Sequence, residues 1–150
     1  MKTNSSARGQ PATSTGRFDV VAIAKTLPDT ATTLLVDKYL TDRQAASARV
    51  FRVYKPTPPH YHVSCDEYLY VLQGRGTFWM QDPSTRAEFA PGQLLFFERR
   101  TVHAIPDILE APLVFLSIDT PRREPTDIVF VDPSDGTPAT FMARNARRSD

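Results

Sequence analysis

The sequence has a single cysteine, Cys65, so it cannot form an internal disulfide. A chain without disulfides has no need of an oxidising compartment. The sequence also lacks an apolar run of the roughly 20 residues that a helix needs to cross a bilayer. The N-terminal residues contain Lys2 and Arg8 but no apolar stretch that would make a secretory signal. These absences predict a soluble, cytoplasmic protein without a membrane partner.

Net charge is nearly absent too, because 18 basic side chains are balanced by 17 acidic ones and leave a formal charge of +1. A nearly neutral chain gives no electrostatic reason to bind DNA, RNA or an anionic membrane. The 150 residues are enough for one domain with a hydrophobic core of its own. We therefore expect a single domain and no nucleic-acid partner.

Long stretches with a helical period are missing as well, and only residues 43–47 could form one helical turn. Short runs rich in Val, Leu, Phe, Tyr and Thr are instead separated by turn sequences such as Pro91-Gly92. The runs predict strands at residues 18–23, 33–40, 49–54, 67–73, 76–81, 87–89, 93–97, 102–105, 113–119 and 128–131. Many short strands at close spacing predict an all-β sandwich or barrel.

Composition divides the chain into three parts. Residues 1–17 are rich in Ser, Thr, Gly and Gln without an apolar pattern, and we expect them to be a disordered leader. Residues 18–120 hold nearly all of the predicted strands and form the barrel. Residues 121–150 are rich in proline and charge, so we expect an extension with one short strand and a polar tail.

Histidine is scarce, but all three histidines lie where one metal ion could use them. His60 and His62 are separated by one residue, which on an extended strand points both imidazoles to the same face. Glu67 follows closely, and His103 lies beyond a second pair of predicted strands. Imidazoles and a carboxylate suit zinc, iron, manganese, nickel or cobalt. The alternative is two loop histidines beside a surface turn and an unrelated third.

The order of these residues resembles two sequence motifs of the cupin superfamily. The first motif reads His60-x-His62, four residues, Glu67, six residues and Gly74, and the second reads Pro91-Gly92, a strand and then His103. The resemblance implies a double-stranded β-helix, or jelly-roll barrel, of mainly antiparallel strands. It also implies that one divalent transition metal is held inside the barrel by His60, His62, Glu67 and His103.

The sequence departs from the family pattern outside these four positions. Tyr54 stands where the family has a glycine before the first histidine, and Asp107 stands where it has an asparagine. Arg99 and Arg100 replace part of a Pro-x-Gly turn and could either attract an anionic substrate or form an exposed turn. Cys65 could bind a soft metal or fill a tight loop.

Arg52 and Tyr54 are candidates for a substrate pocket, since they alternate along one predicted strand with Phe51 and Val53. If Val50, Arg52 and Tyr54 face the barrel, Arg52 and Tyr54 can bind a substrate carboxylate. If the other set faces inward, both residues lie on the solvated surface. The alternation alone leaves both arrangements open.

Four such ligands leave positions open on an octahedral metal, which favours chemistry or chelation over a closed structural site. We expect an enzyme acting on a small oxygen-rich molecule, with Glu67 able to serve as a catalytic base. A dioxygenase is favoured, and an isomerase or lyase fits the same scaffold. The alternatives are a non-catalytic cupin that binds or senses a small ligand and a purely structural barrel. The resemblance further implies a homodimer, and exposed edge strands within residues 18–40 are the candidate interface.

Overall fold

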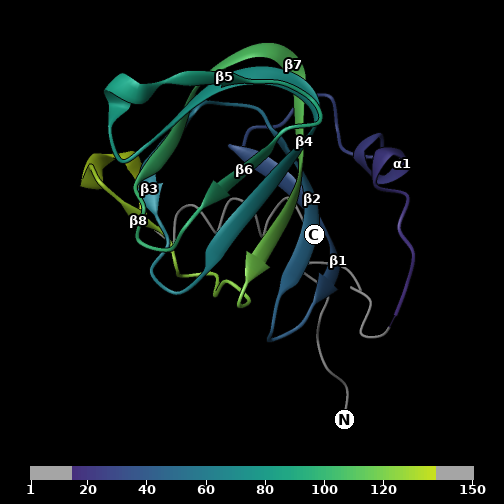
Figure 1. Ribbon diagram of the computed structural model, residues 1–150. Coiled ribbons are helices and arrows are strands. Elements are labelled where there is room, and N and C mark those ends of the chain that lie inside the picture. The colour runs from purple at the N-terminus through teal and green to yellow at the C-terminus, as the bar shows by residue number, and fades with distance from the viewer. Residues whose placement is uncertain (1–14, 138–150) are drawn as a thin grey trace.

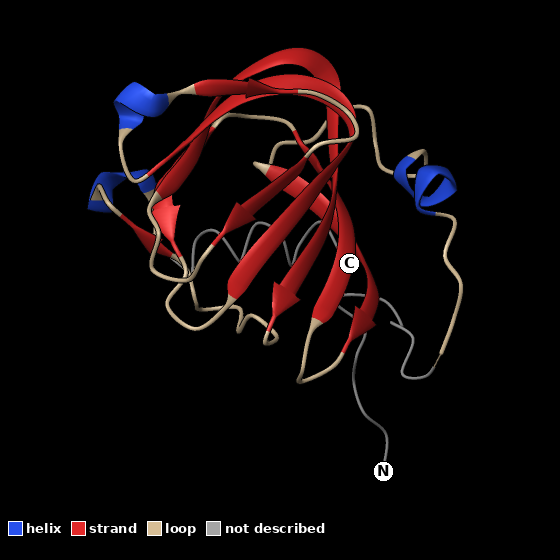
Figure 2. Ribbon diagram, in the orientation of Figure 1, coloured by secondary structure: helices blue, strands red, loops and turns tan. Residues whose placement is uncertain are grey.

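The computed structural model describes residues 15–137 of the chain (Figure 1). Strands make up most of these residues, and Figure 2 shows them curving around a common interior. Their bounds are β1 Leu35–Asp42, β2 Ser47–Val53, β3 Thr57–Tyr61, β4 Asp66–Met80, β5 Ala87–Phe89, β6 Leu94–Phe97, β7 His103–Thr120 and β8 Val129–Phe130. One short α-helix, α1 Val20–Ala24, precedes them, and the 3-10 turns η2 Pro83–Thr85 and η3 Pro133–Asp135 follow β4 and β8.

All strand pairs are antiparallel, which confirms the predicted all-β, mainly antiparallel architecture. The two longest strands organise the sheet, because β7 pairs with β2, β3 and β4 while β4 also pairs with β5 and β6. The strand β1 pairs with β2, and β8 pairs with β3. The ends of β3, β4 and β7 are thereby brought close together.

The long strand β4 joins two segments that the sequence predicts as separate strands, 67–73 and 76–81. Its register against β7 shifts on both sides of Gly74, whose φ is +90°. Glycine adopts this conformation without a Cβ penalty, so the strand bends there instead of ending. The predicted strands 102–105 and 113–119 likewise belong to one continuous strand, β7.

Two local predictions are wrong. Residues 18–23 were expected as a strand, but α1 begins here because the Asp19 side chain accepts a hydrogen bond from the amide of Ala22 at 3.0 Å and caps the helix. Residues 43–47 do not form a helical turn. Residues 43–46 make the loop between β1 and β2, which is closed by a hydrogen bond from the amide of Arg43 to the carbonyl of Ala46 at 3.0 Å, and Ser47 begins β2.

The strand β3 was not predicted, because two prolines interrupt its hydrogen bonding. Pro58 and Pro59 have no amide donor, and the pairing of β3 with β7 skips from Thr57 to His60. The prolines keep this segment extended, since their φ is fixed near the value of extended chain. The first histidine is therefore presented on a short, stiff strand.

Two apolar clusters form the core. The larger one fills the interior of the curved sheet, and Phe51, Val71, Phe97, Leu113 and Phe115 are among its members. The smaller one lies between the β1–β2 surface and the N-terminal segment that includes α1. The strand β2 is consequently buried on both faces, with its alternate residues in the two clusters.

Some predictions fall outside the described residues. The leader predicted for residues 1–17 and the polar tail predicted within 121–150 lie largely in residues 1–14 and 138–150, and both stay predictions. The one strand expected after residue 120 is present as β8. Among the helices of residues 15–137, none is long and apolar enough to span a membrane.

Candidate metal centre

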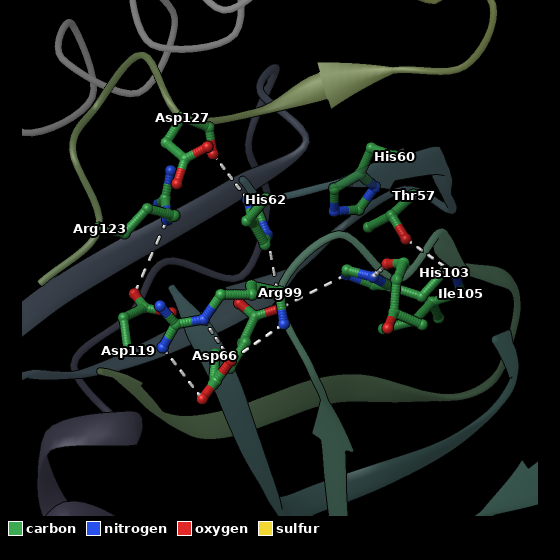
Figure 3. Close-up of polar contacts among 12 residues, drawn as sticks. Thr57, His60, His62, Asp66, Arg99, His103, Ile105, Asp119, Arg123 and Asp127 are labelled. Carbon is green, nitrogen blue, oxygen red and sulfur yellow. Dashed lines mark hydrogen bonds and ion pairs between the residues drawn. The ribbon is translucent and has the colours of Figure 1, made fainter. Parts of the chain in front are cut away.

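The three histidines and Glu67 come from strand ends that meet inside the barrel. His60 lies on β3 and pairs across the sheet with His103, the first residue of β7. His62 directly follows β3, and Glu67 is the second residue of β4. The ring nitrogens of the three histidines that could bind a metal all lie within 4.8 Å of one another, and Figure 3 shows the rings turned towards a common point.

Glu67 completes this cluster. Its Oε1 lies 3.6 Å from Nε2 of His62 and 3.5 Å from Nε2 of His103, and the side chain is almost fully buried. The alternation of β4 explains this position, because Glu67, Leu69 and Val71 face inward. The structure therefore brings together all four residues that the motif resemblance implies.

A backbone carbonyl orients each of the three imidazole rings. Nδ1 of His60 is bonded to the carbonyl of Pro58 at 2.7 Å, that of His62 to Asp127 at 2.7 Å and that of His103 to Thr101 at 2.9 Å. A carbonyl only accepts, so Nδ1 of each ring donates and Nε2 is the nitrogen that remains for a metal. The ring of His103 is further held by Phe97, stacked at 4.0 Å between centroids.

The charge states suit a cation at this point. Burial, and then the neighbouring His103 and His62, hold the pKa of His60 well below its usual range, so this ring is neutral. Burial by itself raises the pKa of Glu67, but a proton on Nε2 of His103 or His62 beside it holds the pKa well below its usual value, so the carboxyl is the ionised partner of these rings.

One ring nitrogen at the centre of the cluster is left without a hydrogen-bond partner in the described structure. Nε2 of His103 is buried and has no hydrogen-bond partner among the described residues. Lone pairs and a carboxylate that converge without a donor are unfavourable unless a cation lies between them. Nitrogen and carboxylate donors in this combination fit a divalent transition metal.

The C-terminal extension forms one wall of the cluster, a contribution that the sequence did not predict. The carbonyl of Asp127 accepts the bond from His62, and the carboxylate of the same residue accepts from the amides of Val63 and Ser64 at 2.7 and 2.9 Å (Figure 3). Asp127 therefore holds both the His62 ring and the turn that follows it. No local sequence pattern marks this long-range contact.

Arg52 and Tyr54, the candidates for a substrate pocket, lie away from the histidines on the outer face of β2. Arg52 donates to the carbonyl of Asp29 at 3.1 Å, and the Tyr54 hydroxyl donates to the carbonyl of Pro28. The inward set of β2 lines the cavity beside the cluster instead, including Arg49 and Phe51. The alternation of β2 is real, but its other phase faces the interior.

The cavity itself is small, about 50 Å³, and mostly apolar in its walls. Besides Arg49, a second arginine reaches it from the C-terminal extension, Arg123, which the sequence did not suggest as a site residue. Arg49 could have been found from its shared face with Phe51 and Val53. Arg123 carries no such signal, because it follows the last long strand in an irregular segment.

Cys65 and Arg99 do not line the cavity and make contacts elsewhere in the fold. Cys65 is fully buried in the turn before β4, and the cavity beside the histidines is not lined by it. Arg99 forms a salt bridge with Asp66, with 3.0 Å between Nε and Oδ1, on an exposed turn. Arg100 follows on the same turn with a φ of 67°.

Comparisons with known proteins agree with this architecture. The family model described as "Cupin domain" matches residues 51–119, and no curated protein matches the sequence. KdgF from Halomonas sp. is similar in structure, with a TM-score of 0.53, 21% identity, and coverage of 59% of this chain and 79% of that one.

Two further solved structures are similar over more of the chain. An uncharacterized conserved protein with a double-stranded β-helix domain from Klebsiella pneumoniae has a TM-score of 0.61 and 14% identity, covering 79% of this chain and 99% of its own. A mannose-6-phosphate isomerase-like protein from Ralstonia eutropha has a TM-score of 0.60 and 18% identity, covering 71% and 98%. At these identities the likeness concerns the fold, which is the predicted double-stranded β-helix. Residues 51–119 of the chain match a cupin domain.

Proposed function

We propose that this chain is a metal-dependent enzyme that holds one divalent transition metal through His60, His62, Glu67 and His103. The observation that carries the proposal is the convergence of three ring nitrogens and one carboxylate, among which Nε2 of His103 is buried without a hydrogen-bond partner in the described part of the chain. The carbonyl bonds to Nδ1 fix the rings in the ligating tautomer before any metal arrives.

The residues divide the chemical work. A divalent metal held there would polarise the oxygen atoms of a chelated substrate and, as iron or manganese, would also activate dioxygen. The three rings and Glu67 would leave two positions open on the metal if it were octahedral. Glu67 is ionised and can serve as a catalytic base. The apolar walls of the small cavity exclude water and favour a small oxygen-rich molecule as substrate.

The proposed reaction is of the dioxygenase type, because two open positions suffice for a substrate oxygen and for dioxygen. Isomerase and lyase reactions use the same polarisation of a substrate oxygen without dioxygen. Oxygen uptake separates these reactions. Iron-loaded protein that consumes oxygen with a catechol or diketone supports the dioxygenase, whereas turnover without oxygen uptake redirects the proposal to the other two. Ligand binding without any turnover would leave a binding protein.

Elemental analysis of the purified full chain tests the metal site first. We expect close to one equivalent of a transition metal per chain, and we expect His62→Ala and Glu67→Gln to lose it while the far-ultraviolet circular dichroism stays that of the barrel. Asp66→Asn is the matched control for Glu67→Gln, since Asp66 is the neighbouring acid and pairs with Arg99 on the surface. Unchanged metal content in His62→Ala would refute the site.

A homodimer and a cytoplasmic location also belong to this proposal. Among residues 15–137, β1 pairs with β2 and with no other strand, so one edge of β1 is left to pair with a second copy of the chain. A cytoplasmic location rests on the single buried cysteine.

A further inference from the structure

Two arginines line the cavity beside the histidine cluster, and neither belongs to the proposed metal ligands. Arg49 lies on β2 and Arg123 on the C-terminal extension, and their exposed fractions are 4% and 6%. Arginine is almost never buried to this degree unless its charge is paired. The groups that pair with these two guanidinium groups therefore bear on what the cavity binds.

Arg49 already has strong partners. Its Nη1 donates to Oδ2 of Asp37 at 3.0 Å, and its guanidinium lies 4.8 Å from the centre of the Phe51 ring. Its Nε lies 3.9 Å from Oδ2 of Asp119, too far for a hydrogen bond, and has no other acceptor among the described residues. Nη1 of Arg49 is thus held by Asp37, whereas its Nε faces Asp119 without a hydrogen bond.

Arg123 is paired less well. Its Nε lies 3.7 Å from Oδ2 of Asp119, the contact drawn as a dashed line in Figure 3. Both Nε and Nη1 are buried and have no hydrogen-bond acceptor among residues 15–137. A buried charged donor without an acceptor is strongly unfavourable. Within the same residues, the carboxylate oxygens of Asp119 are also buried without a hydrogen-bond donor, so this pair is held by charge alone and Nη1 of Arg123 is left for another acceptor.

The charges around the cavity indicate which charge a ligand beside Arg123 should carry. Arg49 and Arg123 contribute two positive charges, and Asp37, Asp119 and Glu67 contribute three negative charges. A divalent metal on the proposed ligands turns this deficit of one into an excess of one positive charge. Buried charges are stable only when they are matched, so a monoanion restores the balance.

We infer that Arg123, assisted by Arg49, binds a carboxylate of the substrate, which is then a small hydroxy or oxo acid. A guanidinium presents its donors in a planar fork that matches the two oxygens of a carboxylate. The cavity of about 50 Å³ has room on the order of a few water molecules and suits a short acid better than a phosphate ester. The inference rests on the proposed function, because the charge balance calls for an anion only when the divalent metal is bound.

Titration calorimetry of the full chain with lactate and with its neutral analogue lactamide tests the inference. The metal content of each preparation is measured in parallel, so that a missing metal and a missing carboxylate site give different results. We expect lactate to bind at least about tenfold more tightly than lactamide, because charged hydrogen bonds are stronger than neutral ones. Inorganic phosphate is titrated as the competing anion.

Arg123→Gln should weaken lactate binding by roughly tenfold to a hundredfold, while leaving lactamide binding and metal content unchanged. Arg123→Lys keeps the positive charge but loses the planar pair of donors, so its affinity for lactate should lie between those of the wild type and Arg123→Gln. If Arg123→Gln does not fold, Arg123→Lys is the variant that tests the inference. Arg75→Gln is the control, because Arg75 is exposed and pairs with Glu88 and Glu110 far from the cavity.

Three results would overturn the inference. The first is equal affinity of the wild type for lactate and lactamide. The second is an unchanged lactate affinity in the folded Arg123 variants. The third is a preference for phosphate over lactate that depends on Arg123, which would assign the site to a phosphorylated ligand. A lactate preference that depends on Arg123 and is equally strong in protein without metal would keep the carboxylate site and overturn the charge-balance argument, while the metal content of His62→Ala still tests the metal site separately.

Discussion

Cys65 lies in the turn between two proposed metal ligands, and its surroundings keep the thiol protonated. Burial, and then the nearby carboxylates of Asp119 and Glu67, raise the pKa of this thiol to about 12. The pKa of a cysteine in an unfolded chain is about 8.5. Because the folded pKa is the higher one, the contribution of the neutral thiol to stability is complete below about pH 8.5 and is lost as the pH rises towards 12.

Thiol modification tests this environment. At pH 8 we expect Cys65 of the native protein to react with a disulfide reagent at least about a hundredfold more slowly than in denaturant, since the thiolate is the reacting species. The control moves the thiol to an exposed turn by combining Cys65→Ala with Ser84→Cys, and this variant should react rapidly when native. Rapid modification of native wild-type protein would show that the thiol is accessible or ionised.

Single residues differ in how far the sequence can predict them. The four proposed ligands could be predicted because three of them lie within one short segment, where strand geometry and motif spacing limit where side chains point. Arg52 was a reasonable candidate, but only packing decides which phase of an alternating strand faces the core, and the phase of Arg49 is buried. Arg123 depends on a contact across the fold that no local pattern encodes.

The bend of β4 shows how an element depends on one glycine. Gly74 has a φ of +90°, and a Cβ added there would lie 2.7 Å from the carbonyl oxygen of Glu110 and 2.8 Å from Cα of Leu113. These are backbone atoms of the neighbouring strand β7, which cannot move without breaking its pairing with β4. Gly92 has almost the same φ, +91°, but no atom lies within 4 Å of its added Cβ.

The two glycines form a matched pair for mutation. Gly92→Ala should lower the free energy of unfolding by about 1 kcal/mol, the cost of a left-handed conformation for alanine. Gly74→Ala adds a clash with backbone and should lower it by about 3 kcal/mol or more. Urea denaturation of both variants measures the difference. Equal losses would mean that β4 and β7 separate easily at the bend.

Local patterns predicted strands well where alternation was regular and failed where a longer-range contact decided the outcome. The sequence predicted separate strands at 67–73 and 76–81, yet β4 continues because β7 follows it on both sides of the bend. The segment at 18–23 is apolar enough for a strand, but its cap and its packing on the smaller apolar cluster make it helical. Such outcomes depend on neighbours that are distant in sequence.

For the molecule as a whole, the site extends beyond the part that matches the family. Residues 51–119 match the cupin model, whereas Asp127 orients His62, and Arg123, Ile128 and Phe130 line the cavity from the extension. Through β8 the extension also pairs with β3, the strand that carries His60. The extension is therefore part of the cavity wall, and under the proposed function substrate selection would depend on residues outside the matched segment.

The proposed homodimer places the free edge of β1 against a second copy. Light scattering of the purified chain should give twice the monomer mass of 16.8 kDa. Alternate amides of an edge strand point away from its partner. We therefore expect those amides of β1 to be protected from hydrogen exchange in the dimer and to lose this protection on dilution to monomers.

A second exposed surface, on β4 and β6, is the alternative interface against which the β1 prediction can be tested. Tyr70, Leu94 and Phe96 expose 40%, 55% and 41% of their area on the outer face of β4 and β6, which makes an apolar stripe of the kind found at interfaces. If β1 forms the interface, the double variant Leu94→Lys and Phe96→Lys stays dimeric, because the stripe is not covered. A monomeric double variant, with β1 exchange unchanged, would move the interface to the stripe and leave the β1 edge without a partner.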